Sequence, residues 1–490
     1  MNRDYAGGFG VGVRVARDRY GHTGGGFERM PNVILAHSTG ILREAGHRID
    51  FCDAQAEDLD ARRVLDRVGA VDPDLLVTCI NLPSLDGDRS LLASIRNAYP
   101  GLPIVASGTV CKTLPGDAIG GGLVDLSPMV EEESVIALAA QCLADGLPVT
   151  RAPGGLAWVD GALVPSGPAP PARPLDDLPF PAYDLMPMGA YTMRLLGRTL
   201  RYAPIFTTRG CPFPCTYCPY PIGLGSKVRY RTPARVIQEI ELVRDLGAEG
   251  LIFRDQTFSL NKKHAESVCR LLAEKGLGMQ WSCETRVDLV TDPMLQLMRK
   301  AGCRVIEYGM ETGDPELLAA VGKPGATLED LRDAVRLTRR AGLMARVHLI
   351  IGLPGETWQT VQRTLDALFE LRVDNADFNV ITPYPGTPLH AWAVERGFLL
   401  ARSWSDYTGI DPAMRTEQMT AEDLKRAQLY LDWSFRRNAP FVTRWGRRWR
   451  VFRYNADRME RLGRFVKGRA LTAFPPGRLR DEVPFGPAAK

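Results

Sequence analysis

The chain has 490 residues, of which 45% are hydrophobic and 24% are charged, and its formal net charge is +4. These values are typical of a soluble globular protein and exclude a disordered chain and a repeat fibre. At about 150 residues per domain, the length predicts two to four domains, each long enough to bury a core. No apolar run reaches about 18 residues and the first residues lack an apolar segment, which argues against a transmembrane helix and a secretory signal.

The first 150 residues alternate short apolar runs with stretches of helical period. This alternation predicts an α/β domain over 1–150, built on a doubly wound (Rossmann-like) parallel sheet. The expected strands are 48–52, 75–80, 104–107 and 124–126, and the expected helices include 30–45 and 90–98. Such a domain normally opens with a buried strand, whereas this chain opens in a Gly-rich loop. We therefore expect either an abbreviated first strand or a start codon assigned too late.

Residues 151–200 are rich in proline, which fixes φ and removes a backbone donor, so we expect a linker without regular structure there. From 201 to 400 the alternation becomes regular and predicts a partial (βα)6 barrel, whose ligands should lie at the carboxyl ends of its strands. We place these strands near Ile205, Leu251, Met279, Val305, Val347 and Phe378, with helices over 233–246, 264–275 and 328–341. Residues 401–490 are expected to form a basic helical C-terminal region.

Three of the ten cysteines crowd into eight positions at the end of the first barrel strand. In the segment TTRGCPFPCTYCPYP, Cys211, Cys215 and Cys218 follow a CxxxCxxC spacing on a Gly- and Pro-rich loop. Three thiolates on one tight loop can bind three irons of a 4Fe-4S cluster and leave the fourth iron open. Structural zinc is the alternative, but it needs four ligands and usually CxxC pairs. Ten cysteines are too few for a disulfide scaffold, so we expect a reducing cytoplasmic location.

This loop resembles the CxxxCxΦC signature of the radical S-adenosylmethionine (SAM) enzymes. Further resemblances follow at strand ends, in RDQTF (254–258), CETRVD (283–288), GMETG (309–313) and IIGLPGET (350–357). The resemblance implies that the three cysteines hold the cluster and that SAM is cleaved to a 5'-deoxyadenosyl radical. It also implies a set of SAM contacts: Tyr217, Asp255, Arg286, Glu311, Gly352 and Gly355. An ordinary Arg286–Asp288 ion pair and glycines that merely end strands remain the alternatives.

The domain order is similar to that of the cobalamin-binding radical SAM family. The stretches compared are EAGHRIDFCDAQ (44–55), DLLVTCINLP, PIVASGTVCKTLP (103–115) and VDLSPMVEEES (124–134). The family's DxHxxG loop corresponds to Asp53-Ala54-Gln55, which has no histidine, so we expect cobalamin bound without a protein imidazole. The resemblance implies that Asn81, Leu82 and Pro83 cover its lower face and that its nucleotide tail passes Gly108 and Thr109.

A second branch, the methylthiotransferases, carries an extra cluster on three N-terminal cysteines, and this chain has Cys52, Cys79 and Cys111. However, Cys52 lies in an apparent strand, no CxxN loop occurs near the amino end, and no small RNA-binding β domain follows the barrel. We interpret these three as core thiols, and Cys142, Cys269, Cys283 and Cys303 as core or supporting residues.

The resemblance implies a cobalamin-dependent radical SAM C-methyltransferase acting at an unactivated carbon of a secondary-metabolite or lipid intermediate. The alternative is a radical rearrangement, cyclisation or oxidation in which cobalamin is accessory or absent. His348 and Tyr384 are candidate substrate contacts, although a lone histidine is more often a core residue. No catalytic acid or base is assigned, because hydrogen-atom abstraction needs none. An electron donor of the flavodoxin or ferredoxin type is expected.

Residues 436–480 contain fourteen Lys or Arg and two acidic residues. An amphipathic basic helix of this kind can lie on an anionic membrane or bind an acidic carrier protein. Nucleic acid is a weaker alternative because it leaves the cysteine loop unexplained, and a barrel-capping helix with solvated arginines is the simplest one. The aromatic residues interleaved with arginine are Trp445, Trp449, Phe452, Tyr454 and Phe465.

Overall fold

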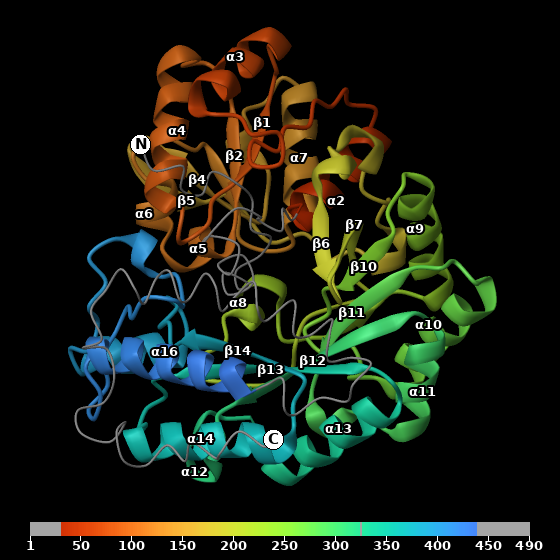
Figure 1. Ribbon diagram of the computed structural model, residues 1–490. Coiled ribbons are helices and arrows are strands. Elements are labelled where there is room, and N and C mark those ends of the chain that lie inside the picture. Colours follow the sequence, from red (N-terminus) through yellow and green to blue (C-terminus); the bar gives the residue numbers. More distant parts are fainter. Residues whose placement is uncertain (1–30, 324–325, 439–490) are drawn as a thin grey trace.

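The computed structural model describes residues 31–323 and 326–438, which form two sheets with helices packed around them (Figure 1). In the first sheet, strands β1 to β5 lie in sequence order. Strands β1 to β3 are parallel, and β4 and β5 are antiparallel. The strands are β1 (Leu76–Cys79), β2 (Ile104–Ser107), β3 (Leu126–Pro128), β4 (Gly155–Val159) and β5 (Ala162–Pro165).

The central strands β2 and β3 of this first sheet are buried on both faces, as expected for a doubly wound sheet. Val105 and Leu126 pack with Val135 and Ile136 on one face, beneath α7 (Glu132–Ala144) and the neighbouring α2 (Val33–Glu44). Ile104 and Ala106 face the other side and pack against residues of α3 (Ala61–Val71) and α4 (Leu85–Ala98). The expected Rossmann-like arrangement is confirmed.

The second sheet has the strand order β14-β13-β12-β11-β10-β7-β6. Its first six strands are parallel neighbours, which confirms the six expected βα units, and β6 adds an antiparallel edge. The strands are β6 (Thr192–Leu195), β7 (Arg198–Ile205), β10 (Gly250–Phe253), β11 (Gln280–Thr285), β12 (Cys303–Glu311), β13 (Met344–Ile351) and β14 (Asn375–Val380). The main outer helices are α9 (Pro233–Asp245), α10 (Lys262–Lys275), α11 (Asp292–Lys300), α13 (Leu328–Arg340), α14 (Trp358–Leu371) and α16 (Ala421–Asn438).

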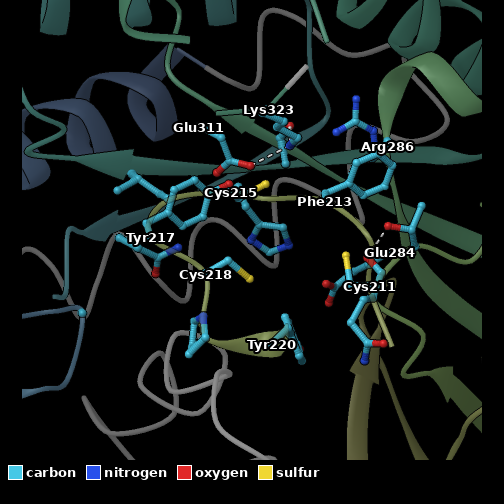
Figure 2. Close-up of a pocket in the computed structure, with 18 of the residues that line it drawn as sticks. Cys211, Phe213, Cys215, Tyr217, Cys218, Tyr220, Glu284, Arg286, Glu311 and Lys323 are labelled. Atoms are coloured by element: carbon cyan, nitrogen blue, oxygen red, sulfur yellow. Dashed lines mark hydrogen bonds and ion pairs between the residues drawn. The ribbon is translucent and has the colours of Figure 1, made fainter. Parts of the chain in front are cut away.

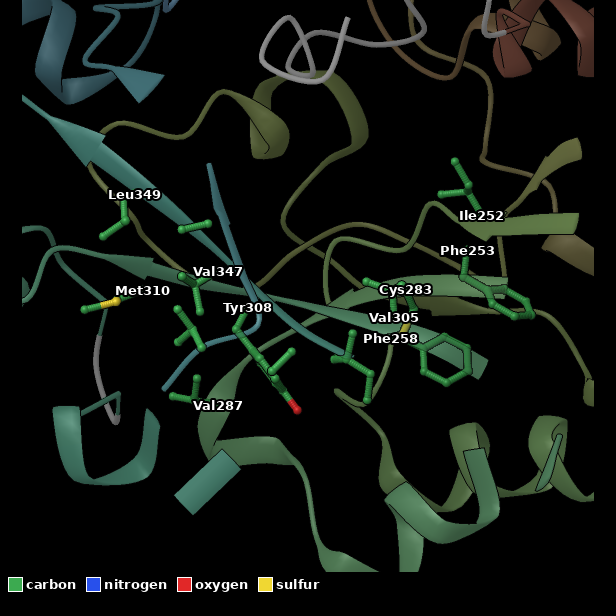
Figure 3. Close-up of a cluster of buried hydrophobic side chains, with 14 of the residues drawn as sticks. Ile252, Phe253, Phe258, Cys283, Val287, Val305, Tyr308, Met310, Val347 and Leu349 are labelled. Carbon is green, nitrogen blue, oxygen red and sulfur yellow. The ribbon is translucent and has the colours of Figure 1, made fainter. Parts of the chain in front are cut away.

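The sheet curls into a half barrel whose outer side is apolar (Figure 3). The rings of Phe253, Phe258 and Trp281 pack with centroids 4.9 to 5.5 Å apart. Aromatic pairs at these separations stabilise beyond their burial alone. The Tyr308 hydroxyl is hydrogen bonded to Thr338 of α13 at 2.7 Å, so its polar atom is satisfied inside the apolar layer.

Two expectations about local structure are wrong. Residues 48–52 form no strand, because their side chains serve separate partners: Asp50 pairs with Arg67, and Phe51 packs against the barrel core. The Pro-rich stretch does contain regular structure, in the β4–β5 hairpin and in β6. The turns at Asp160-Gly161 and Leu196-Gly197 have positive φ at both positions, which matches the right-handed twist of hairpins.

The first domain lies against the barrel beside the cysteine loop. Helix α5 (Thr109–Thr113), which follows β2, contacts α8 (Tyr220–Leu224), which follows the loop (Figure 1). Arg209 donates to Glu133 at 2.5 Å and to Glu131 at 3.2 Å, and its side chain is only 6% exposed. The carboxyl edge of the first sheet and the cysteine loop are therefore fixed relative to each other.

The basic segment beyond residue 438, with its interleaved aromatic residues, lies outside the described residues, as does the Gly-rich N-terminal loop. Helix α16, which precedes this segment, packs on β14, where Arg436 is buried and bonded to Asp432 and to the Ala376 carbonyl. Within the described part of the chain, no helix has the length and apolar character needed to cross a membrane.

Gly108 offers a test of this packing. Its φ is +136°, and a Cβ there would lie 2.1 Å from the Ile80 carbonyl oxygen. We expect Gly108→Ala to destabilise the first domain by about 2 kcal/mol or more, because strain and a backbone clash add. Gly116→Ala is the matched control, since a Cβ at this helical position meets nothing within 4 Å. Urea unfolding followed by circular dichroism checks both, and equal midpoints would contradict the account.

Candidate active site

The cysteine loop begins directly after β8 (Thr208–Arg209) and runs to β9 (Arg229–Tyr230), which pairs antiparallel with β8. Gly210 starts the loop with φ +98°, and a Cβ there would lie 2.3 Å from the Lys227 carbonyl oxygen, so only glycine fits. The backbone N–H of Cys211 donates to the Gly225 carbonyl, which closes the loop. All three thiols, Cys211, Cys215 and Cys218, line one cavity of about 260 Å³ (Figure 2).

The spacing of the thiols suits a cluster better than a single metal ion. Among the described residues, the one group of three Cys, His, Asp or Glu ligand atoms within 4.8 Å of each other does not include them. Sulfur atoms around one zinc ion would lie about 3.8 Å apart, given Zn–S bonds of about 2.3 Å. Burial raises the pKa of the Cys218 thiol to about 12, so binding a metal must displace its proton.

Asp255 holds the chain that leads into this loop. Its carboxylate is fully buried and accepts from the backbone N–H groups of Thr207 and Thr208 at 2.9 and 2.5 Å, and from both hydroxyls at 3.1 and 2.7 Å. Burial raises its pKa to about 6 despite these four donors. Asp255 does not line the cavity. It joins the end of β10 to the segment just before the cysteines.

Glu311 is aimed into the cavity by unusual backbone geometry. The register between β12 and β13 shifts at Gly309/Glu311, and Glu311 has φ +63°, a conformation that non-glycine residues rarely adopt. Its carboxylate binds the Lys323 ammonium at 2.7 Å. Burial raises the pKa of the neighbouring Tyr217 phenol, and the Glu311 carboxylate raises it further. Strain of this kind gathers at functional sites.

Arg286 lies across the cavity from Glu311 (Figure 2). It forms an ion pair with Asp288 at 2.9 Å, and its guanidinium also lies over the Phe213 ring, 4.0 Å from the centroid. Arg286 therefore forms the expected ion pair with Asp288 and also lines the cavity. A guanidinium stacked on an aromatic ring is held in one plane, which suits recognition of a carboxylate.

Gly352 and Gly355 do not line the cavity. Both have positive φ, +96° and +91°, and a Cβ on Gly352 would contact Ile381 and Leu424 at 2.8 and 2.9 Å. The Gly352 N–H donates to the buried carboxylate of Glu356, whose pKa burial raises to about 7. This turn packs the end of β13 against the barrel core.

His348 and Tyr384 line the cavity, as do several residues that were not predicted. Alternate residues of a strand lie on the same face, and three alternate residues of β12 line the cavity: Glu307, Gly309 and Glu311. Applied to each barrel strand, this two-residue period would have found them. The cavity residues missed from the sequence include Phe213, Glu284, Glu307, Lys323 and Asn379.

The residues expected around cobalamin gather at the carboxyl edge of the first sheet. Asn81 and Leu82 follow β1, while Gly108 and Thr109 follow β2, next to the Ile80 carbonyl. The Thr109 hydroxyl is buried and has no hydrogen-bond partner, and the Ser134 hydroxyl at the start of α7 shares both properties. Buried hydroxyls are usually paired, so these two point to a ligand.

Cys52, Cys79 and Cys111 are not gathered into one site. Cys52 is exposed, and its charged neighbours are Arg67, Glu57, Asp50 and Asp53. Cys79 and Cys111 are close to each other, and burial raises the pKa of both. No three-thiol cluster site occurs within the described part of the first domain.

Comparison with known proteins supplies a context for this site. Residues 205–368 match the Radical SAM superfamily. The uncharacterized methyltransferase PH0819 of Pyrococcus horikoshii is 28% identical over 398 residues, covering 81% of this chain and 85% of that protein. The anaerobic magnesium-protoporphyrin IX monomethyl ester cyclase of Cereibacter sphaeroides is 27% identical over 409 residues, covering 80% of this chain and 65% of that protein.

A solved structure shares the whole architecture. The radical S-adenosylmethionine methyltransferase TsrM from Kitasatospora setae, with cobalamin and a [4Fe-4S] cluster bound, aligns with a TM-score of 0.69. The alignment covers 91% of this chain and 98% of that chain at 17% identity. The likeness therefore extends through both domains of the fold.

Asp255→Asn tests how the loop is held. An amide oxygen cannot accept from all four donors, so buried donors are left unpaired at a cost of about 1–3 kcal/mol. We expect a lower unfolding midpoint and less iron bound after anaerobic reconstitution. Asp245→Asn, on an exposed side chain at the end of α9, should change neither quantity. An Asp255→Asn variant with the wild-type iron content would show that the carboxylate does not position the loop.

The raised pKa of the buried Glu356 carboxyl predicts that the stability of the protein depends on pH. Its pKa of about 7 in the folded state lies above the usual 4.5, so the folded protein retains a proton that the unfolded chain loses in this interval. The contribution of Glu356 to the free energy of unfolding is fully present below pH 4.5 and falls by about 3 kcal/mol as the pH rises to 7. Glu356→Gln should remove that part of the slope, whereas Glu395→Gln on the exposed side of α15 (Pro388–Glu395) should leave it unchanged. Parallel slopes for wild type and Glu356→Gln in urea unfolding would refute this assignment.

Proposed function

The chain belongs to the radical SAM superfamily, and on that premise we propose that it is a cobalamin-dependent C-methyltransferase acting at an unactivated carbon of a small molecule or lipid. One observation supports this most directly. Three thiols line a single cavity at the carboxyl ends of the barrel strands, and the carboxyl edge of a Rossmann-like sheet lies beside the same loop. A radical cofactor and a methyl carrier would then face one cavity.

In this proposal Cys211, Cys215 and Cys218 hold three irons of a [4Fe-4S] cluster, and the fourth iron is left for the amino and carboxylate groups of SAM. Of the SAM contacts expected from the sequence, Tyr217, Arg286 and Glu311 line the cavity. Their charges suit a zwitterion, because Arg286 complements a carboxylate and Glu311 complements an ammonium. Asp255, Gly352 and Gly355 instead position the surrounding backbone.

The residues at the edge of the first sheet fit cobalamin held without a protein imidazole. The Asp53 carboxylate, at the position of the family's histidine loop, accepts from Tyr191 at 2.8 Å and from the Ala56 N–H at 2.9 Å, so it serves the fold. Asn81 and Leu82 would cover the lower face, and the Thr109 and Ser134 hydroxyls would bind the nucleotide tail. When bound, cobalamin supplies a methyl group and SAM supplies the radical.

The chain's own residues exclude water and orient the substrate. Phe213, Ile350 and Ile381 give the cavity an apolar wall, which suits a reactive carbon radical. His348 and Tyr384 would contact the substrate. No side chain has to remove a proton in the abstraction step, because a hydrogen atom leaves as a whole.

Ring formation is the second candidate, and the similarity to the Cereibacter sphaeroides cyclase favours it. In that case the same cysteines and SAM contacts would act, but no methyl group would reach the product. An electron donor of the flavodoxin or ferredoxin type would reduce the cluster in either case. A membrane or carrier protein as a further partner of the basic C-terminal segment remains part of the proposal.

The metal content of the protein tests the proposal. After anaerobic reconstitution with iron, sulfide and hydroxocobalamin, we expect about four irons and one cobalt per chain. Replacing Cys211, Cys215 and Cys218 together by alanine should remove the iron and leave the cobalt, because the two sites are on different sheets. Replacing Cys142, Cys269 and Cys303 by alanine, one at a time, is the matched control and should retain both.

Labelled methyl groups then separate the two candidate reactions. With SAM labelled in its methyl group, the methyltransferase incorporates label into product, whereas a cyclase does not. Iron without cobalt would contradict the cobalamin-dependent proposal and favour the second candidate.

A further inference from the structure

Two carboxylates and an imidazole meet inside the cavity, on three neighbouring strands. They belong to Glu284 of β11, Glu307 of β12 and His348 of β13, and one ligand atom from each lies within 4.8 Å of the others. The His348 Nε2 and Glu307 Oε2 atoms are 3.0 Å apart. Glu284 lies near Cys211 in the close-up of the cavity (Figure 2). None of these three residues has a role in the cluster or SAM contacts described above.

The strand register forces the two carboxylates together. Glu284 and Glu307 are direct partners in the parallel β11–β12 ladder, so their side chains emerge side by side on the same face. Like charges at such neighbouring positions are destabilising. A cation shared between the two carboxylates reverses the sign of that interaction. Apolar residues, common elsewhere in this sheet, would have avoided the repulsion altogether.

A third carboxylate orients the imidazole. The His348 Nδ1 atom lies 3.5 Å from Asp377 Oδ2 of β14, and Asp377 is itself paired with Arg346. With Nδ1 directed at Asp377, Nε2 is the nitrogen that points towards Glu307. In histidines that bind metals, a carboxylate beside the other ring nitrogen usually fixes the tautomer and the ring orientation, and Asp377 has this position here. The side chain of Asp377 is only 2% exposed, so its position is well defined.

We propose that Glu284, Glu307 and His348 bind one divalent transition-metal ion, separate from the cluster. Two ligand atoms bound at about 2.1 Å and at right angles to each other lie about 3.0 Å apart, the separation of the histidine and Glu307 atoms. Mixed imidazole and carboxylate ligands suit zinc, manganese or ferrous iron. Three protein ligands also leave coordination positions open towards the cavity, as in sites that bind a substrate.

The open positions face the cavity that also contains the cysteine loop, which suggests what the ion does. A substrate oxygen, from a hydroxyl, carboxylate or phosphate group, would complete the coordination and hold a nearby carbon at a fixed distance from the cluster. This role for the substrate rests on the proposed function, whereas binding of the ion does not. The substrate class is thus an oxygen-bearing, metal-chelating molecule.

Cobalt(II) is a suitable probe because its visible spectrum reports its ligands. The full chain with Cys211, Cys215 and Cys218 replaced by alanine is used, so that neither a cluster nor these thiols can bind the added metal. We expect one Co²⁺ per chain, with visible ligand-field bands and no thiolate charge-transfer band. Glu307→Gln and His348→Ala should each abolish these bands, and Asp377→Asn should weaken binding about 10–100-fold.

Two exposed or half-buried residues on other elements provide the controls. Glu316→Gln, on α12 (Pro315–Ala320), and His390→Ala, on α15, should bind Co²⁺ like the parent. Circular dichroism verifies that each variant is folded. If the Glu307→Gln protein is unfolded, the test is repeated with Glu284→Gln. Absence of the bands, or bands that survive in both Glu307→Gln and His348→Ala, would overturn the proposal. The same variants in the chain with its three loop cysteines should still bind four irons, so a failure here is distinct from a failure of the proposed function.

Discussion

A buried ion pair between the two domains fixes the cysteine loop relative to the first sheet. Arg209 precedes Cys211 by two residues and binds Glu133 and Glu131, which lie at the start of α7 in the first domain. Removing a guanidinium from water is costly, and two carboxylates with good geometry are needed to offset that cost. A pair of this kind tolerates little displacement, because any separation leaves charges buried without partners. The cysteine loop is thereby tied to the edge of the sheet at which Gly108 and Thr109 lie.

Other buried polar groups extend this constraint in both directions. Asp255 holds Thr207 and Thr208 from the barrel side, so the segment leading to the loop is fixed by one carboxylate within the barrel and by two across the domain boundary. Lys112 of α5 donates to the carbonyls of Val130 and Gly223, which joins the first domain to α8 on the far side of the loop. The loop is polar at its attachment points and borders apolar residues in the cavity. This division suits a site that must hold charged cofactors and yet shield a radical.

Much of this architecture could be predicted from the sequence, for physical reasons that differ from element to element. Each barrel strand contains a short apolar run followed by a turn and a helical stretch, which predicts its position, and the CxxxCxxC spacing identifies the cysteine loop. The prediction of a strand at 48–52 was wrong because the polar and apolar side chains there contact separate partners: Asp50 pairs with Arg67, and Phe51 packs against the barrel core. The hairpins at Asp160-Gly161 and Leu196-Gly197 were missed because the high proline content of 151–200 predicts irregular structure, whereas these two turn dipeptides favour hairpins. Glu307 and Glu284 were missed because a charged residue inside a buried strand breaks the apolar pattern. The two-residue period along β12 places Glu307 on the cavity face, but only the register between the strands brings it beside Glu284.

A cluster held by the barrel and cobalamin held by the first sheet would face one cavity. Electron paramagnetic resonance of the anaerobically reconstituted protein tests this arrangement most directly, since both Co(II) cobalamin and the reduced cluster are paramagnetic. We expect that reducing the cluster broadens or splits the Co(II) signal by dipolar coupling, and that the effect is absent when Cys211, Cys215 and Cys218 are alanine. A Co(II) signal unchanged by cluster reduction, in a protein that contains both centres, would contradict the claim.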